Sequence, residues 1–304
     1  MNRTFSTLLA GFALFACSGC EAKAPPPKPV KQSVARPALW KVYDADTTVY
    51  LFGTIHLLPQ GMTWTGPKLD AAMAQSQDLV LETVIDDPAA LGAIMMKLGR
   101  SPGLPPILDR VPPAIRPKLK ATIDKTGIPI ATLDGMETWA ASLVISTASL
   151  RAADLTSDEG AEAQLTAAFR KAGKPVNGLE TPAQQLGYFD GLSEAAQRQF
   201  LVSVSDGSAN IAKEFGAMIA SWRRGDVKNI AQTFNNEMKD SAELADTLLT
   251  KRNQRWAAWI VQRMAKPGTV FVAVGAGHLA GKDSVEALLT AQGKAKGVKV
   301  VRVQ

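Results

Sequence analysis

From about residue 38 onward, short apolar runs alternate with longer amphipathic stretches. Apolar runs of strand length bounded by turn residues predict β-strands, whereas apolar positions that recur every three or four residues predict helices. The predicted strands span 40–43, 47–52, 78–81, 174–179, 269–274 and 297–303, and the main predicted helices span 138–152, 159–171, 210–222, 227–238, 241–264 and 283–290. This succession predicts an α/β (α+β) fold with a mixed, largely parallel β-sheet and flanking helices.

The pattern shows no second long linker and no internal repeat, so residues 38–304 are predicted to form one domain. Residues 101–117 differ from the rest of this domain because six of them are prolines. Proline lacks an amide hydrogen and interrupts both helices and strands. We therefore expect a loop or lid over this stretch.

The N-terminal region has a different pattern. A positively charged start precedes an apolar stretch of twelve residues, 5–16, which is shorter than the roughly 18 residues that span a bilayer. Both cysteines of the chain, Cys17 and Cys20, follow directly. This layout predicts a signal peptide over residues 1–19, of the type found in bacterial lipoproteins, with Cys17 or Cys20 as the lipidated residue.

Residues 20–37 are rich in Pro and Lys and predict an extended linker between the membrane and the domain. The chain has a formal net charge of +6, of which Arg3 carries one and residues 20–36 a net three. The remaining +2 is spread over the whole body, so the basic footprint of a nucleic-acid-binding domain is absent. We expect an exported, periplasmic protein that is lipid-anchored to the membrane and binds no nucleic acid.

Four predicted strands are followed by a side chain that can bind a metal or move a proton: His56, Glu82, Glu180 and His278. These histidines are the only two in the chain, and each is the last residue of a Gly-x-x-His motif. The glycines, Gly53 and Gly275, allow a sharp backbone turn or a close approach at the strand end. Ligands of open α/β sheets bind at the carboxyl ends of the strands, so we expect a site there. The alternative is that each histidine is a structural residue of the core.

Two neutral imidazoles with one or two carboxylates predict a divalent metal site for Zn, Mn, Co or Fe(II). The predicted metal ligands are His56, His278 and Glu82. Glu82 and Glu180 are the predicted catalytic carboxylates, one as a ligand and the other as the general base that takes a proton from water. No glycine-rich nucleotide motif is present, so a nucleotide cofactor is not supported.

These residues lie in blocks that resemble the TraB/GumN family, which includes the Tiki metalloproteases and is more distantly similar to erythromycin-esterase and ChaN-like proteins. The matching blocks are residues 51–59, 79–82, 173–181, 252–256 and 271–281. The resemblance implies that His56, His278 and Glu82 belong to a metal-dependent hydrolytic centre, with Glu180 as a further candidate.

The resemblance also covers an Arg-Asn-x-x-Trp block that begins at Arg252 and Asn253. It implies a substrate-binding pair in which Arg252 clamps a substrate carboxylate or an oxyanion and Asn253 orients a peptide carbonyl. The alternative for this pair is hydrogen bonding on a helix surface. Where the family often has Gly-x-Asp, this chain has Glu162, and no role is carried over to that residue.

The sequence thus predicts a metal-dependent, peptidase-like hydrolase of the bacterial envelope that acts on a peptide or protein substrate. Two alternatives stay open. One is a non-catalytic binding module that holds a peptide, glycan or haem-like ligand in the same crevice. The other is an accessory factor for polysaccharide export or conjugation, in which the residues at the strand ends have structural roles.

Overall fold

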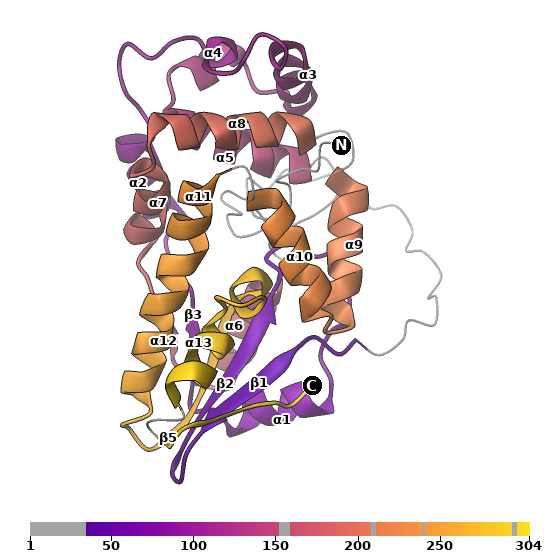
Figure 1. Ribbon diagram of the computed structural model, residues 1–304, viewed down its shortest axis with the longest axis vertical. Coiled ribbons are helices and arrows are strands. Elements are labelled where there is room, and N and C mark those ends of the chain that lie inside the picture. The colour runs from indigo at the N-terminus through magenta and orange to yellow at the C-terminus, as the bar shows by residue number, and fades with distance from the viewer. Residues whose placement is uncertain (1–34, 152–158, 208–210, 239–240, 294–296) are drawn as a thin grey trace.

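The computed structural model describes residues 35–151, 159–207, 211–238, 241–293 and 297–304 (Figure 1). The predicted signal peptide (1–19) with Cys17 and Cys20, and nearly all of the predicted linker (20–37), lie outside the described residues. Among the helices that the structure describes, none is both long enough and apolar enough to span a bilayer.

A six-stranded mixed sheet forms the lower half of the molecule in Figure 1. The strands are β1 (Leu39–Tyr43), β2 (Thr47–Thr54), β3 (Asp78–Leu81), β4 (Val176–Gly178), β5 (Gly268–Gly275) and β6 (Lys299–Arg302). Their order is β4-β3-β5-β2-β1-β6, with β4, β3, β5 and β2 mutually parallel and β1 and β6 antiparallel to their neighbours. The predicted α/β fold with a mixed, largely parallel sheet is therefore confirmed.

Local chemistry explains the two best-defined predictions. β1 and β2 form a hairpin because the Asp44 carboxylate accepts hydrogen bonds from the amides of Asp46 and Thr47, which closes the turn. β5 is an almost continuous apolar run because it lies in the middle of the sheet, where helices cover both faces. β6 lies at the sheet edge, as its Lys and Arg residues indicate.

Helices cover both faces of the sheet. On one face, Phe52 and Phe271 pack against α1 (Pro67–Gln75), α6 (Ala161–Lys171) and α9 (Ile211–Arg223). On the other face, the alternate side chains of the same strands pack against two C-terminal helices, α12 (Lys251–Arg263) and α13 (Val285–Gly293). α10 (Val227–Met238) lies beside α9 (Figure 1). The result is a three-layer arrangement.

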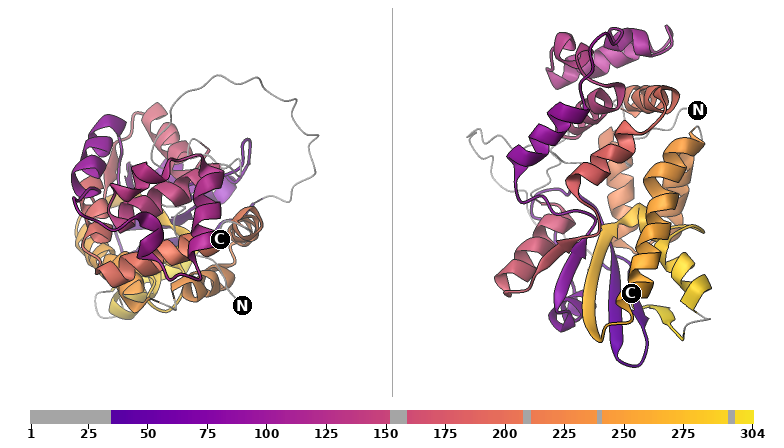
Figure 2. Two further views of the ribbon diagram at one scale, coloured as in Figure 1. Left: turned by 90° about the horizontal axis from the view of Figure 1, so that it is seen from above. Right: turned by 90° about the vertical axis from the view of Figure 1, so that its left-hand side faces the viewer.

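A second hydrophobic core lies beyond the sheet, in the helices at the top of Figure 1 and in the right-hand view of Figure 2. Its helices are α2 (Pro88–Leu98), the 3-10 helix η2 (Ile107–Arg110), α3 (Arg116–Thr126), α4 (Ile130–Asp134), α5 (Thr138–Arg151), α7 (Pro182–Asp190) and α8 (Glu194–Gly207). Most of these helices are not predicted by the periodicity, because they bury apolar residues against one another rather than against one flat face.

The predicted loop or lid over residues 101–117 is mostly loop, interrupted by η2, but it is packed into the second core rather than free as a lid. Ile107 is fully buried in the second core, and Arg110 is 1% exposed. The Arg110 guanidinium donates hydrogen bonds to the carbonyl groups of Pro105, Asp134 and Met136. The prolines therefore shape a packed turn whose carbonyl groups surround a buried cation.

Candidate functional site

The carboxyl ends of β2, β3, β4 and β5 meet at one edge of the sheet because these four strands are parallel neighbours. His56 lies two residues after β2, Glu82 directly follows β3, and Glu180 lies two residues after β4. His278 lies in the 3-10 helix η4 (Ala276–Leu279), which continues from β5. The structure therefore brings together all four residues that the strand pattern singles out.

Backbone pairing continues beyond the ends of β3 and β4. The amide of Leu179 donates to the carbonyl of Leu81, and the amide of Glu180 donates to the carbonyl of Glu82, both at 2.8 Å. This pairing holds the two glutamates on adjacent chains. Both side chains are buried, with 8% of Glu82 and 7% of Glu180 exposed.

Arg252 lies between the two glutamates. Its Nη2 is 2.6 Å from Oε2 of Glu82 and 2.8 Å from Oε2 of Glu180. Its guanidinium also lies over the ring of Trp256, 4.6 Å from the centroid. Burial alone would raise the pKa of Glu82, but the charges of Arg252 and the nearby histidines lower this pKa to about 2.

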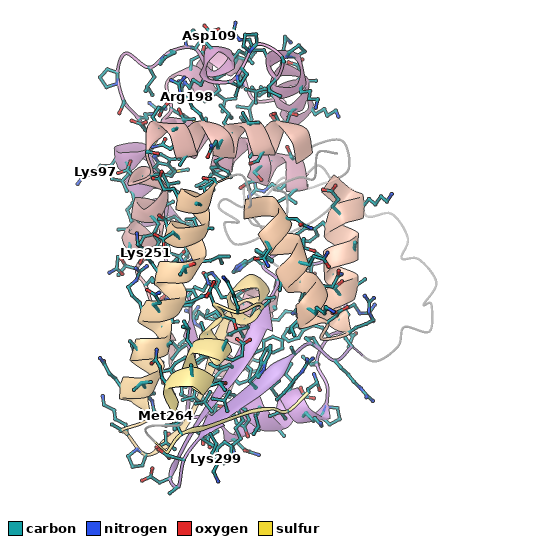
Figure 3. The ribbon with its side chains drawn as sticks, viewed as in Figure 1. Lys97, Asp109, Arg198, Lys251, Met264 and Lys299 are labelled. Atoms are coloured by element: carbon teal, nitrogen blue, oxygen red, sulfur yellow. The ribbon has the colours of Figure 1, made fainter. Side chains whose placement is uncertain are left out.

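Arg252 comes from α12, which crosses the sheet lengthwise. The helix runs from Lys251, level with the carboxyl ends of the strands, to Met264 near their amino ends (Figure 3). It follows the short α11 (Ala242–Ala245) and the π-helical turn η3 (Asp246–Thr250). The predicted helix over 241–264 is therefore helical throughout, with a wide turn just before Arg252.

Glu180 is surrounded by donors. Its Oε1 accepts from Trp256 Nε1 at 3.1 Å and from the Tyr188 hydroxyl at 3.2 Å. Its Oε2 accepts from Gln185 Nε2 at 3.3 Å and from Arg252. Both oxygens are thus engaged by fixed donors, so the carboxylate is held in one orientation.

His278 is 6% exposed and is contacted at both ring nitrogens. Nδ1 lies 2.6 Å from Oδ1 of Asn253, and Nε2 lies 3.2 Å from Nη1 of Arg252. Burial and the charge of Arg252 lower the pKa of His278 to about 3, although Glu82 acts in the opposite direction. The imidazole is therefore neutral at physiological pH.

His56 has a different partner. Its Nδ1 lies 2.7 Å from Oε1 of Glu162, and the two side chains are 18% and 17% exposed. The first turn of α6 places Glu162 here because the amide of Ala161 donates to the carbonyl of Ile55 at 2.9 Å. Burial lowers the pKa of His56, but the Glu162 and Glu82 carboxylates together outweigh it and the net shift is upward.

Glu162 is the site residue that the sequence interpretation leaves without a role. The signal that points to it is its place in the chain, where the resemblance implies Gly-x-Asp and this sequence has Glu162. Its carboxylate holds Nδ1 of His56, which turns Nε2 toward the site.

The absence of a side chain at Gly275 leaves the space where three candidate ligands converge. A Cβ atom at this position would lie 3.1 Å from Oε1 of Glu82, 3.6 Å from Nε2 of His56 and 3.7 Å from Cδ2 of His278. The Gly275 amide donates to Oε1 of Glu82 at 2.7 Å. Gly53 has a packing role, because its Cβ would lie 3.1 Å from Cα of Ala276 and push η4 away.

These residues fit a divalent metal in donor type and orientation. Nε2 of His278 and Oε1 of Glu82 are 3.7 Å apart, a separation that two ligands of one ion adopt. Two buried carboxylates, Glu82 and Glu180, face the one guanidinium of Arg252, and Glu162 contacts His56, so the cluster holds more carboxylates than guanidinium groups. A cation would balance this excess of negative charge.

The metal ligands are nevertheless not assembled as a finished site. Among the described residues, no three His, Cys, Asp or Glu side chains are grouped closely enough to hold an ion. Arg252 contacts the lone pair of Nε2 on His278. Closing the ligand set around an ion requires Nη1 of Arg252 to release that nitrogen.

Comparison with known proteins gives one result. The model of the TraB/PrgY/gumN family matches residues 38–295, which is most of the chain. No curated protein and no solved structure matches.

Proposed function

Because the chain belongs to the TraB/PrgY/gumN family and carries this cluster, we propose that it is a metal-dependent, peptidase-like hydrolase. In this proposal His56, Glu82 and His278 hold a divalent ion, Mn, Co, Zn or Fe(II). The observation that supports it best is the convergence of Nε2 of His56, Oε1 of Glu82 and the ring of His278 on the space above Gly275.

The protein residues divide the work. A divalent ion bound there supplies Lewis acidity for a carbonyl oxygen and lowers the pKa of water. Glu82 presents Oε1 to the site while Arg252 fixes its Oε2. Glu162 holds Nδ1 of His56, so that Nε2 faces the site.

Glu162 is not placed to act as the general base. It contacts Nδ1 of His56, on the far side of the ring from a metal at Nε2, and its Oε2, which has no hydrogen-bond partner among the described residues, is buried away from water. Glu180 has both oxygens engaged by donors. The sequence predicts a catalytic role for Glu180, and its contacts favour acting through Arg252 instead.

The proposal includes the cell envelope as the location. The support is the sequence pattern of residues 1–37, with a short apolar stretch followed by two cysteines and a Pro- and Lys-rich linker. In this proposal the lipid on Cys17 or Cys20 anchors the protein to the membrane, and the substrate is a peptide or protein. Mass spectrometry of the mature N-terminus identifies the modified cysteine, and an intact residue 1 contradicts the proposal.

A second candidate is a non-catalytic binding module. The observation that favours it is the Arg252 contact with Nε2 of His278, which occupies a lone pair that a metal needs. In this role the crevice holds a peptide, glycan or haem-like ligand without turning it over. A Soret band on haem titration, or saturable binding without products, is its signature.

The test is hydrolysis of a peptide library by purified protein loaded with Mn²⁺, Co²⁺ or Zn²⁺, with and without chelator. The proposal expects cleavage that the chelator stops and that Gly275→Ala abolishes, because the added Cβ fills the space between the ligands. Gly216→Ala is the matched control, since its Cβ meets nothing within 4 Å. Binding without cleavage under every metal supports the second candidate.

A further inference from the structure

Every N–H group of Arg252 already has an acceptor inside the protein. Nε–H donates to Glu180 at 3.1 Å, and the two hydrogens of Nη2 serve Glu82 and Glu180. Nη1 lies 3.2 Å from both the carbonyl oxygen of Leu248 and Nε2 of His278. A guanidinium has five N–H donors, so in the metal-free protein none is left for a substrate carboxylate or an oxyanion.

The backbone before Arg252 contributes one of these acceptors. The π-helical turn η3 widens the helix, and the amide of Lys251 donates to the carbonyl of Asp246, five residues earlier. The Leu248 carbonyl in this turn accepts from the Arg252 side chain. The guanidinium is thus anchored to its own helix as well as to the two glutamates.

Asn253, the next residue, is held in the same way. Its Nδ2 donates to the carbonyl of Asp283 at 2.8 Å, which fixes the orientation of the amide. Oδ1 must then be the atom that faces Nδ1 of His278, 2.6 Å away. Asn253 is 3% exposed, so solvent and substrate do not reach this contact.

Together the two residues determine the protonation pattern of the His278 ring. An amide oxygen accepts, so the hydrogen of the neutral imidazole is on Nδ1. A guanidinium only donates, so Nε2 carries the lone pair. This is the tautomer in which Nε2 can act as a ligand or an acceptor.

We propose that Arg252 and Asn253 are positioning residues, which fix Glu82 and the Nδ1–H tautomer of His278 in the metal-free protein. The purpose of this positioning, to hold metal ligands, rests on the proposed function. The tautomer of His278 does not, because the protein's own contacts determine it. In the metal-free protein this positioning role takes the place of the substrate-binding role that the family resemblance implies for this pair.

The test uses nitrogen-15 NMR of the imidazole rings in the metal-free, full-length protein at neutral pH. The chain has two histidines, so two ring systems are observed, and His56→Gln assigns them. The inference expects a slowly exchanging proton on Nδ1 of His278 and an unprotonated Nε2. A proton on Nε2 of His278 in the wild type overturns it.

Variants of Asn253 test whether its side chain holds the Nδ1 proton of His278 or only fills space. Asn253→Leu has similar size but no acceptor, and is expected to lose the protected Nδ1 proton. Asn253→Asp keeps an acceptor and is expected to keep that proton. Asn235→Leu, an exposed position on α10, is the matched control and leaves the signal unchanged. A protected Nδ1 proton that persists in Asn253→Leu also overturns the inference.

A second readout links the inference to the site. Mn²⁺ affinity is expected to fall about 10–100-fold in Asn253→Leu and to be largely retained in Asn253→Asp. If wild-type protein binds no divalent metal, the proposed function fails while the NMR result still decides the tautomer. If metal binds equally well to both variants, the positioning role is overturned and the proposed function stands.

Discussion

The two Gly-x-x-His motifs lie at the ends of adjacent parallel strands, yet their histidines have opposite electrostatic environments. In the sheet Gly53 lies opposite Val274, so the motifs are offset by one residue. His278 is held by a neutral amide and a cation, and its pKa falls to about 3. His56 is held by a carboxylate, and its pKa rises.

This difference shows that the Gly-x-x-His motif determines where each histidine lies, while side chains from the neighbouring helices determine its protonation. The glycines bring both imidazoles to the same edge of the sheet. Burial and the charge of Arg252 on α12 keep one ring neutral by lowering its pKa, and Glu162 on α6 favours a proton on the other. A metal site needs both rings neutral when it is loaded, so metal binding displaces any proton on His56.

The largest expected effect on stability comes from Arg252→Met, which removes the cation beside His278. This change leaves Glu82 and Glu180 buried without their cation, and the free energy of unfolding is expected to fall by about 3–5 kcal/mol. Arg255→Met on the same helix is the control, because Arg255 is exposed and its guanidinium lies 4.9 Å from the centroid of the Tyr188 ring, away from both glutamates' ion pairs with Arg252. Urea denaturation measures both, and equal losses contradict the central role of Arg252.

The His56 side is tested by Glu162→Gln, which keeps a side chain of the same size but removes the charge beside Nδ1. Outer partners of metal-ligating histidines contribute about 10–100-fold to affinity, or about 1.4–2.7 kcal/mol. We expect a loss of Mn²⁺ affinity in that range by isothermal titration. Glu159→Gln is the control, because it removes one negative charge near the site without touching the contact between Glu162 and His56. A similar loss of Mn²⁺ affinity in this control would mean that net charge alone explains the effect.

The smallest effect is the opposite pH dependence of the two rings. The folded pKa of His278 lies below its unfolded value, so this residue costs stability as pH falls from about 6.5, by up to about 1.4 kcal/mol per pH unit. The folded pKa of His56 is raised, so its contribution is fully present below the unfolded pKa of about 6.5 and is lost as pH rises through the higher folded pKa.

Urea unfolding of metal-free protein between pH 5 and 8 measures this contrast. His278→Gln is expected to flatten the loss of stability toward acid, and His56→Gln is expected to steepen it. Proton NMR gives the same information directly, since His278 should not titrate in this range. Titration of His278 near pH 6.5 removes the distinction between the two rings.

Strand ends and their polar side chains are local features, so the sequence suffices to predict the sheet and the edge where His56, Glu82, Glu180 and His278 meet. The partners of these residues come from distant segments and leave no periodic signal. Glu162 reaches His56 only because α6 is tied to the strand end through Ile55. The second helical core escapes prediction for the same reason, since its helices pack against one another across long sequence distances.

The most direct measurement is the metal content of purified, folded protein by elemental analysis, compared with the His56→Ala/His278→Ala double variant. The proposed function predicts about one equivalent of Mn, Co, Zn or Fe in the wild type after mild reloading, and none in the folded double variant. A folded wild-type protein that takes up no divalent metal under any loading condition contradicts it.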